Sequence, residues 1–68
     1  MKREIFEGKA TADVHAETES RKKGSELFVV KCGSSGSYGI NYQIITSSKE
    51  LRPGEKIVSH YSKGNKLV

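Results

Sequence analysis

The amino-acid sequence predicts an all-β fold, built mainly from antiparallel strands and hairpins with one short helical turn near residues 48–52. Two apolar runs, residues 27–32 and 38–46, are joined by the glycine- and serine-rich segment 33–37, which is the pattern of a hairpin. Turn signals recur about every ten residues, as in small β-proteins. We therefore expect a single small β-domain over residues 1–68.

The central hairpin carries most of this prediction. In its second run every other residue from Tyr38 to Thr46 is aromatic or β-branched, which is typical of a half-buried strand. The first run, Leu27 to Cys32, is largely apolar at positions of both parities, which favours a strand that is covered on both faces.

The segment ahead of this hairpin is open to two interpretations. Ile5 and Phe6 predict a short first strand, and the next residues, 7–9, a turn. Over residues 9–18 small apolar side chains alternate with polar ones, and this period of two favours a second strand. Residues 19–24 are polar and predict an exposed loop.

A helix is the alternative for the same segment. Thr11 is able to act as its N-cap, and the basic triplet Arg21, Lys22 and Lys23 followed by Gly24 has the composition of a helix C-terminus. Only Ala12 and Ala16 share an apolar helical face, so we favour the strand.

The remaining residues predict a capped turn and a second hairpin. Ser47 to Glu50 has the spacing of a capping box, and Pro53-Gly54 is the signature of a type II turn. Alternation over residues 55–61 predicts a strand with Ile57, Ser59 and Tyr61 on one face and Val58 and His60 on the other. Residues 63–65 then turn the chain into a last strand.

Size and charge limit the class of protein. A chain of 68 residues buries only about 60% of the surface that it exposes when unfolded. We therefore expect marginal stability unless the chain pairs with a partner, and we favour a homodimer. Twelve basic and eight acidic residues give a formal charge of +4, which is enough either to favour an anionic partner or simply to keep a small domain soluble. The charge alone does not choose between these two interpretations. The single cysteine, with no signal peptide or long apolar span evident, predicts a cytoplasmic protein that does not contact membranes.

Basic residues beside predicted loops are the candidates for contacting nucleic acid. Lysine and arginine bind phosphates, and serine hydroxyls add polar contacts. The predicted nucleic-acid-binding residues are Arg21, Lys22, Lys23, Lys31, Ser34, Ser35, Lys49 and Arg52. A solvated, exposed loop explains the basic residues equally well.

Two further motifs have a structural and a functional interpretation. The loop at residues 33–37 is able to cradle a phosphate with its backbone amides, but a plain hairpin loop explains it as well. The aromatic residues Phe28, Tyr38, Tyr42 and Tyr61 can stack on bases, but their alternation with isoleucines favours burial.

The sequence predicts no enzyme. His15, Cys32 and His60 are isolated and lack the spacing of a zinc site or a nucleophile with its base. Cys32, at the end of an apolar run, predicts a small buried thiol. We therefore expect no catalytic residues, no metal and no cofactor.

After Phe28 the sequence runs through a strand, the loop KCGSSG, a second strand, a capped turn ending at Leu51, the segment RPGEKI and the ending NKLV. This order resembles the swapped-hairpin DNA-binding domain of the AbrB and MazE type. The resemblance implies an intertwined homodimer that binds DNA through basic residues. Two features differ from that family, since residues 41–46 contain no proline and more than twenty residues precede the shared part. Without the resemblance, a small monomeric barrel is the expected architecture.

Two classes of function follow. The first is a small, basic nucleic-acid-binding protein, specifically a dimeric DNA-binding transcriptional regulator, with DNA favoured over RNA. The second is a protein-interaction module, such as an inhibitor or adaptor of the sort mobile elements and phages encode. That module would bind a protein partner through an exposed sheet edge.

Overall fold

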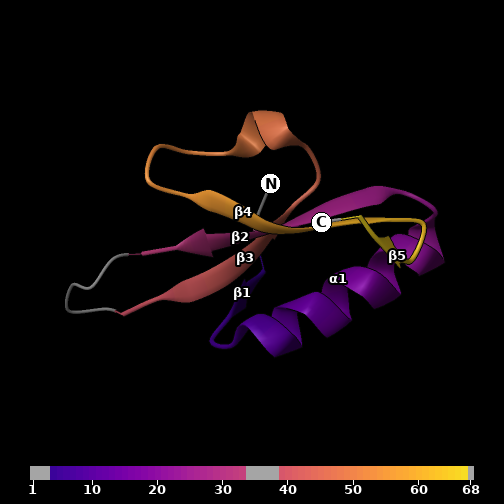
Figure 1. Ribbon diagram of the computed structural model, residues 1–68, viewed down its shortest axis with the longest axis horizontal. Helices are drawn as coiled ribbons and strands as arrows, with labels where there is room; N and C mark the ends of the chain where they lie inside the picture. The colour runs from indigo at the N-terminus through magenta and orange to yellow at the C-terminus, as the bar shows by residue number, and fades with distance from the viewer. Residues whose placement is uncertain (1–3, 34–38, 68) are drawn as a thin grey trace.

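The computed structural model describes residues 4–33 and 39–67, which form one antiparallel sheet of five strands and one α-helix. The sheet order is β1-β3-β2-β4-β5, and the helix lies against one side of it (Figure 1). The elements in chain order are β1 (Ile5–Phe6), α1 (Lys9–Lys23), β2 (Glu26–Cys32), β3 (Asn41–Ile45), the 3₁₀ turn η1 (Ser48–Glu50), β4 (Lys56–Ser62) and β5 (Asn65–Lys66).

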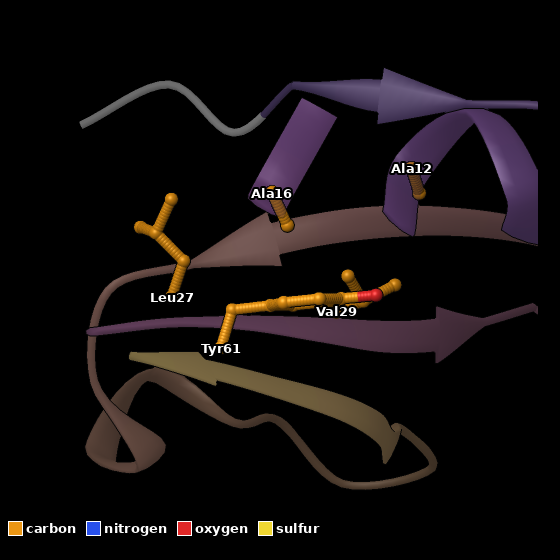
Figure 2. Packing of buried hydrophobic residues seen from close by; sticks show 5 residues of the cluster. All are labelled: Ala12, Ala16, Leu27, Val29 and Tyr61. Atoms are coloured by element: carbon orange, nitrogen blue, oxygen red, sulfur yellow. The ribbon is translucent and has the colours of Figure 1, made fainter. Parts of the chain in front are cut away.

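Strand β2 is the centre of the sheet, as its two apolar faces predict. It pairs with β3 on one side and with β4 on the other. On the helix side, Leu27, Val29 and Tyr61 pack against Ala12 and Ala16 of α1, all five at most 5% exposed (Figure 2). Because alanine has only a methyl group, the helix backbone can approach the strands closely at these two positions.

A second, smaller core lies on the other side of the sheet. Val30, Cys32 and Ile45 are buried there, and Phe28 and Ile57 pack against them. The connection that carries η1 rises on this side, opposite α1 (Figure 1). The Cys32 thiol donates a hydrogen bond to Glu55 Oε2 at 3.2 Å, which joins the end of that connection to β2.

The prediction of a strand over residues 9–18 is wrong, because this segment is the first part of α1. The residue before the helix is Gly8 in an extended conformation, so Thr11 is not the N-cap. The helix ends where the alternative, less favoured interpretation put its C-terminus, since Gly24 follows Lys23 with φ 64° and its N–H bonds to the carbonyl of Ser20. The prediction failed because Ala12 and Ala16 fit two patterns. They belong to the alternation that predicts a strand, and their spacing of four also puts them on one face of a helix.

The exposed loop predicted at residues 19–24 is also wrong, because its first five residues complete the helix. Ser20 is fully buried there. A closed barrel is excluded for the described residues, since the sheet order begins at β1 and ends at β5. The fold is mostly β, and the all-β prediction missed its one α-helix.

Two strands differ in detail from the prediction. Strand β3 spans five residues, so Ile40 and Thr46 fall outside it, and Tyr38 lies outside the described residues. In β4 the partner of Val29 is Ser59 while that of Val30 is Ile57, so Val58 is an extra residue at a β-bulge. The bulge breaks the period of two. Val58 therefore packs with the helix-side core and Ile57 with the other core.

The local turn predictions are confirmed. Glu50 Oε2 accepts the N–H of Ser47 at 3.1 Å while Ser47 Oγ accepts that of Lys49 at 3.2 Å, as in a capping box. Gly54 has φ 87° within the Pro-Gly turn, which is closed by the N–H of Glu55 on the carbonyl of Arg52 at 3.1 Å. No helix among the described residues is long and apolar enough to cross a membrane.

Candidate nucleic-acid interface

The last turn of α1 presents three basic side chains at one end of the molecule. Arg21, Lys22 and Lys23 are exposed and precede the left-handed Gly24, which ends the helix. Cations at this position interact favourably with the negative end of the helix dipole. The helix dipole alone is therefore one reason for basic residues here. Whether Arg21, Lys22 and Lys23 also form a binding site depends on the charges that lie near them.

The turn between β4 and β5 adds two lysines to the same end. Lys63 and Lys66 are exposed and flank Gly64 and Asn65 in sequence. The N–H of Lys63 bonds to the carbonyl of Ser25, just after the helix, at 3.3 Å. Strand β5 lies beside the last turn of α1 (Figure 1). We call the five residues Arg21, Lys22, Lys23, Lys63 and Lys66 the cationic end.

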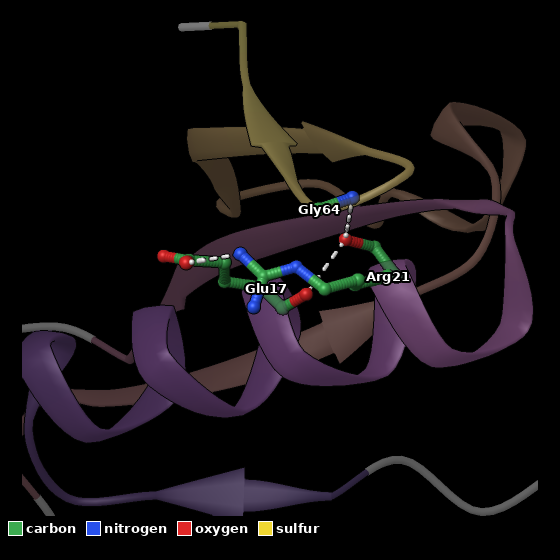
Figure 3. Close-up of polar contacts among 4 residues, drawn as sticks. Glu17, Arg21 and Gly64 are labelled. Carbon is green, nitrogen blue, oxygen red and sulfur yellow. Dashed lines mark hydrogen bonds and ion pairs between the residues drawn. The ribbon is translucent and has the colours of Figure 1, made fainter.

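Direct contacts hold the turn against the helix. The Gly64 N–H donates to Ser20 Oγ at 2.9 Å, and Figure 3 shows the Arg21 side chain lying beside Gly64. Arg21 also donates to Glu17 Oε1 at 3.0 Å, one helical turn back. This ion pair is exposed and of the i,i+4 kind, so it contributes only about 0.3–0.5 kcal/mol and leaves Arg21 able to exchange partners.

The other predicted basic residues lie elsewhere. Lys31 is exposed near the end of β2, five residues from Glu26, or roughly 17 Å along the strand. Lys49 is exposed in η1, and Arg52 is exposed just before the Pro-Gly turn. Arg52 lines a shallow hollow with Cys32 and Gly33, which follow Lys31 directly in sequence. The structure therefore places Lys31 and Arg52 near one another and apart from the triplet Arg21, Lys22 and Lys23. The predicted residues Ser34 and Ser35 lie outside the described residues, as does most of the glycine-serine loop.

Lys31 forms part of a smaller cationic pair. It lies directly opposite Lys56 in the ladder between β2 and β4, and both are exposed. Like charges at facing positions of neighbouring strands destabilise a sheet slightly. A bound anion would reduce the repulsion between Lys31 and Lys56. This pair is therefore a second possible anion-binding position, at the opposite end of β2 from the cationic end.

The aromatic residues are mainly structural, as their alternation predicts. Tyr61 is 3% exposed in the helix-side core, and Tyr42 packs against that core. Phe28 packs on the second core, and its ring stacks on His60 with a centroid distance of 4.2 Å. His60 Nε2 lies 2.7 Å from Glu26 Oε1. None of these described rings stands alone as a platform for a base.

Asp13 is a partly buried carboxylate on α1. Its Oδ2 accepts a hydrogen bond from Lys9 Nζ at 2.7 Å. Burial raises the pKa of this carboxyl, but Lys9 and the hydroxyls of Ser59 and Tyr61 outweigh burial, so the pKa lies below its usual value. Burial and then the charge of Asp13 raise the pKa of Tyr61. Asp13 Oδ1 and Ser59 Oγ are buried, and neither has a well-formed hydrogen bond to the described residues.

The residues with soft or nucleophilic atoms are dispersed. Cys32 is buried, as predicted, and held by Glu55. His15 lies 3.1 Å from Glu4 and 3.8 Å from Glu19, between α1 and the start of the chain. Within residues 4–33 and 39–67, no group of three metal-ligating side chains is arranged to hold an ion.

Sequence reasoning missed Lys63, Lys66 and the buried Ser20. The turn signal at Gly64 located the two lysines in a hairpin, but only the packing of that hairpin on the helix puts them beside Arg21. No protein-family model matches this chain, and neither a curated protein nor a solved structure is detectably similar to it.

Proposed function

We propose that this chain is a nucleic-acid-binding protein whose cationic end contacts the phosphate backbone, and that it acts by binding and not by catalysis. The observation that carries the proposal is the convergence of Lys63 and Lys66 on the basic last turn of α1. The helix dipole accounts for cations on the helix, but it does not call for two more from a separate hairpin. Five clustered cations favour a partner with closely spaced negative charges.

The proposed protein is a homodimeric DNA-binding regulator of transcription in the cytoplasm. The resemblance to the AbrB and MazE type supports DNA over RNA and supports a dimer, and the charge of +4 supports a polyanionic partner. Contacts to phosphates fix position but carry no sequence information, so Arg21, Lys22 and Lys23 supply affinity and not base preference. The proposed contact surface also includes the other predicted residues, Lys31, Lys49, Arg52, Ser34 and Ser35, of which the two serines lie outside the described residues.

The test is a fluorescence-polarisation titration of labelled duplex DNA and duplex RNA at several salt concentrations. Binding through Z phosphates gives a slope of about −0.9Z in log K against log salt. We expect Lys22→Glu/Lys23→Glu to weaken binding of unrelated DNA sequences alike, by at least about tenfold at low salt. Light scattering on the same samples gives the oligomeric state.

The matched comparison is Lys31→Glu/Lys49→Glu, which alters the net charge by the same amount at two exposed residues outside the cationic end. We expect this variant to lose less affinity than Lys22→Glu/Lys23→Glu. If the two variants lose the same affinity, the cationic end is not the main contact, and that assignment is refuted. If the unaltered protein shows no salt-dependent binding to DNA or RNA, nucleic-acid binding is refuted.

A protein-interaction module is the second candidate, and one feature favours it. A shallow hollow of about 490 Å³ lies between β1 and α1, next to the two-residue edge strand. Ile5 and Val14 are each 66% exposed on these two elements. An exposed apolar surface beside a short sheet edge suits the addition of a partner's strand. Its lining residues are Phe6, Ala10, Thr11, Val14, His15 and Thr18. Recovery of one stoichiometric protein without nucleic acid would favour this candidate.

A further inference from the structure

Ser20 joins two parts of the chain that are 44 residues apart. It is a polar residue with no exposed surface, in the last full turn of α1. Its Oγ donates to the carbonyl of Glu17 at 3.0 Å and accepts the N–H of Gly64 at 2.9 Å. The hydroxyl thus uses its hydrogen to satisfy the Glu17 carbonyl and its oxygen to satisfy the Gly64 N–H. The bond to Gly64 attaches the β4–β5 turn to the helix (Figure 3).

Gly64 provides the space that Arg21 occupies. Gly64 is buried with φ 85°, and a Cβ built on it would lie 2.7 Å from Arg21 Nε and 2.8 Å from Arg21 Cβ. A larger residue must displace the turn from the helix, because Arg21 Cβ is fixed to the helix backbone and cannot move aside. Ser20 and Gly64 together therefore set where Arg21 lies relative to the lysines on either side of the turn.

Strand β5 has two residues, so its ladder with β4 gives the hairpin little stiffness of its own. Two bonds hold this hairpin at the end of the helix, from the Gly64 N–H to Ser20 Oγ at 2.9 Å and from the Lys63 N–H to the Ser25 carbonyl at 3.3 Å. Of the two, only the Ser20 bond reaches α1 itself and is made by a side chain, so a substitution can remove it. A fixed arrangement of the charges lowers the entropy lost on binding.

We propose that Ser20 and Gly64 are positioning residues of the nucleic-acid interface. They hold Lys63 and Lys66 against Arg21, Lys22 and Lys23 so that both groups meet one phosphate backbone. The inference rests on the proposed function, which it deepens by naming what assembles the cationic end. Neither residue contacts the nucleic acid through its own side chain.

The test is a double-mutant cycle on the salt dependence of binding to duplex DNA. Ser20→Ala keeps the size of the side chain and leaves all five cations in place. We expect Ser20→Ala to reduce the magnitude of the slope of log K against log salt by up to about 1.8, the contribution of two phosphate contacts. Lys63→Gln/Lys66→Gln should lower it by the same amount. Adding Ser20→Ala to that variant should then change the affinity less than about twofold, since the lysines it positions are gone.

The outcomes separate this inference from the proposed function. An equal loss from Ser20→Ala in both backgrounds marks a merely structural role and overturns the positioning role, as does normal binding by Ser20→Ala. If the unaltered protein does not bind nucleic acid, the proposed function fails and the positioning role fails with it.

A second measurement does not depend on the variant folding. In the unaltered protein, saturating duplex DNA should slow hydrogen exchange of the Gly64 amide, because binding across both cationic groups closes the contact more tightly. Unchanged exchange at Gly64, with the DNA bound, overturns the inference.

Discussion

The two sides of the sheet are closed by different means. On the helix side, Ala12, Ala16 and Ser20 follow one another at spacings of four, and all three have no exposed surface. That side depends on contacts between residues far apart in the chain. Among the described residues, the opposite side buries Val30, Cys32 and Ile45 and lies under a connection that its own turns and caps shape. Both cores join residues far apart in the chain, but a helix covers the first, whereas local turns and caps shape the cover of the second.

The largest expected effect tests the helix side. Ala16→Glu places an unpaired charge between α1 and the sheet, at a cost of about 3–5 kcal/mol, comparable with the total stability of about 3–10 kcal/mol for a chain of this size. We expect the variant to be unfolded by circular dichroism in buffer alone. Val14→Glu changes the same helix at an exposed position and should stay within about 0.5 kcal/mol of the unaltered protein. A folded Ala16→Glu variant would show that the helix is not required to close this side.

The same difference explains which elements the sequence allows one to predict. Strand β2 could be predicted because a short run that is apolar on both faces is typical of a central strand covered on both sides. The capping box and the Pro-Gly turn were predicted because their signals are local. Helix α1 was missed because its buried stripe consists of two alanines and a serine. Such small side chains carry little hydrophobic signal, and they pack here only because the sheet supplies the larger partners.

The second test compares the two sides with similar substitutions. Leu27→Ala on the helix side and Ile45→Ala on the other side each remove a large buried side chain, and such changes cost about 2–5 kcal/mol. We expect Leu27→Ala near the upper end, because α1 and the sheet are rigid layers. Ile45→Ala should cost about 2 kcal/mol, because the connection can move into the space. Urea denaturation measures both. If Ile45→Ala is as costly as Leu27→Ala, the connection is as rigid as the helix.

The candidate site divides in a similar way. Arg21, Lys22 and Lys23 could be selected from the sequence because three adjacent basic residues are visible in any fold. Lys63 and Lys66 could not be joined to them, because the bulge at Val58 and the packing of the β4–β5 turn on α1 decide where that turn lies. Lys31 is near the triplet only in sequence, and Arg52 is a candidate only because it lies beside the Pro-Gly turn. The structure places both away from the triplet.

The smallest expected effect concerns Asp13, a charged group on the helix side. Because its folded pKa is lowered, its contribution to stability is present above the unfolded value of 3.8 and is lost as the pH falls through the folded pKa. We expect Asp13→Asn to cost about 1 kcal/mol at pH 7, where the hydrogen bond from Lys9 is charge-assisted.

The difference in unfolding free energy between the unaltered protein and Asp13→Asn should then shrink as the pH is lowered below 3.8. Urea titrations at several pH values measure this difference. The control is Glu17→Gln, which removes the ion pair with Arg21 on the same helix at a more exposed carboxylate and should cost less than about 0.5 kcal/mol. If the difference between the unaltered protein and Asp13→Asn is the same at every pH, the charge of Asp13 does not stabilise the helix side, and packing alone closes it.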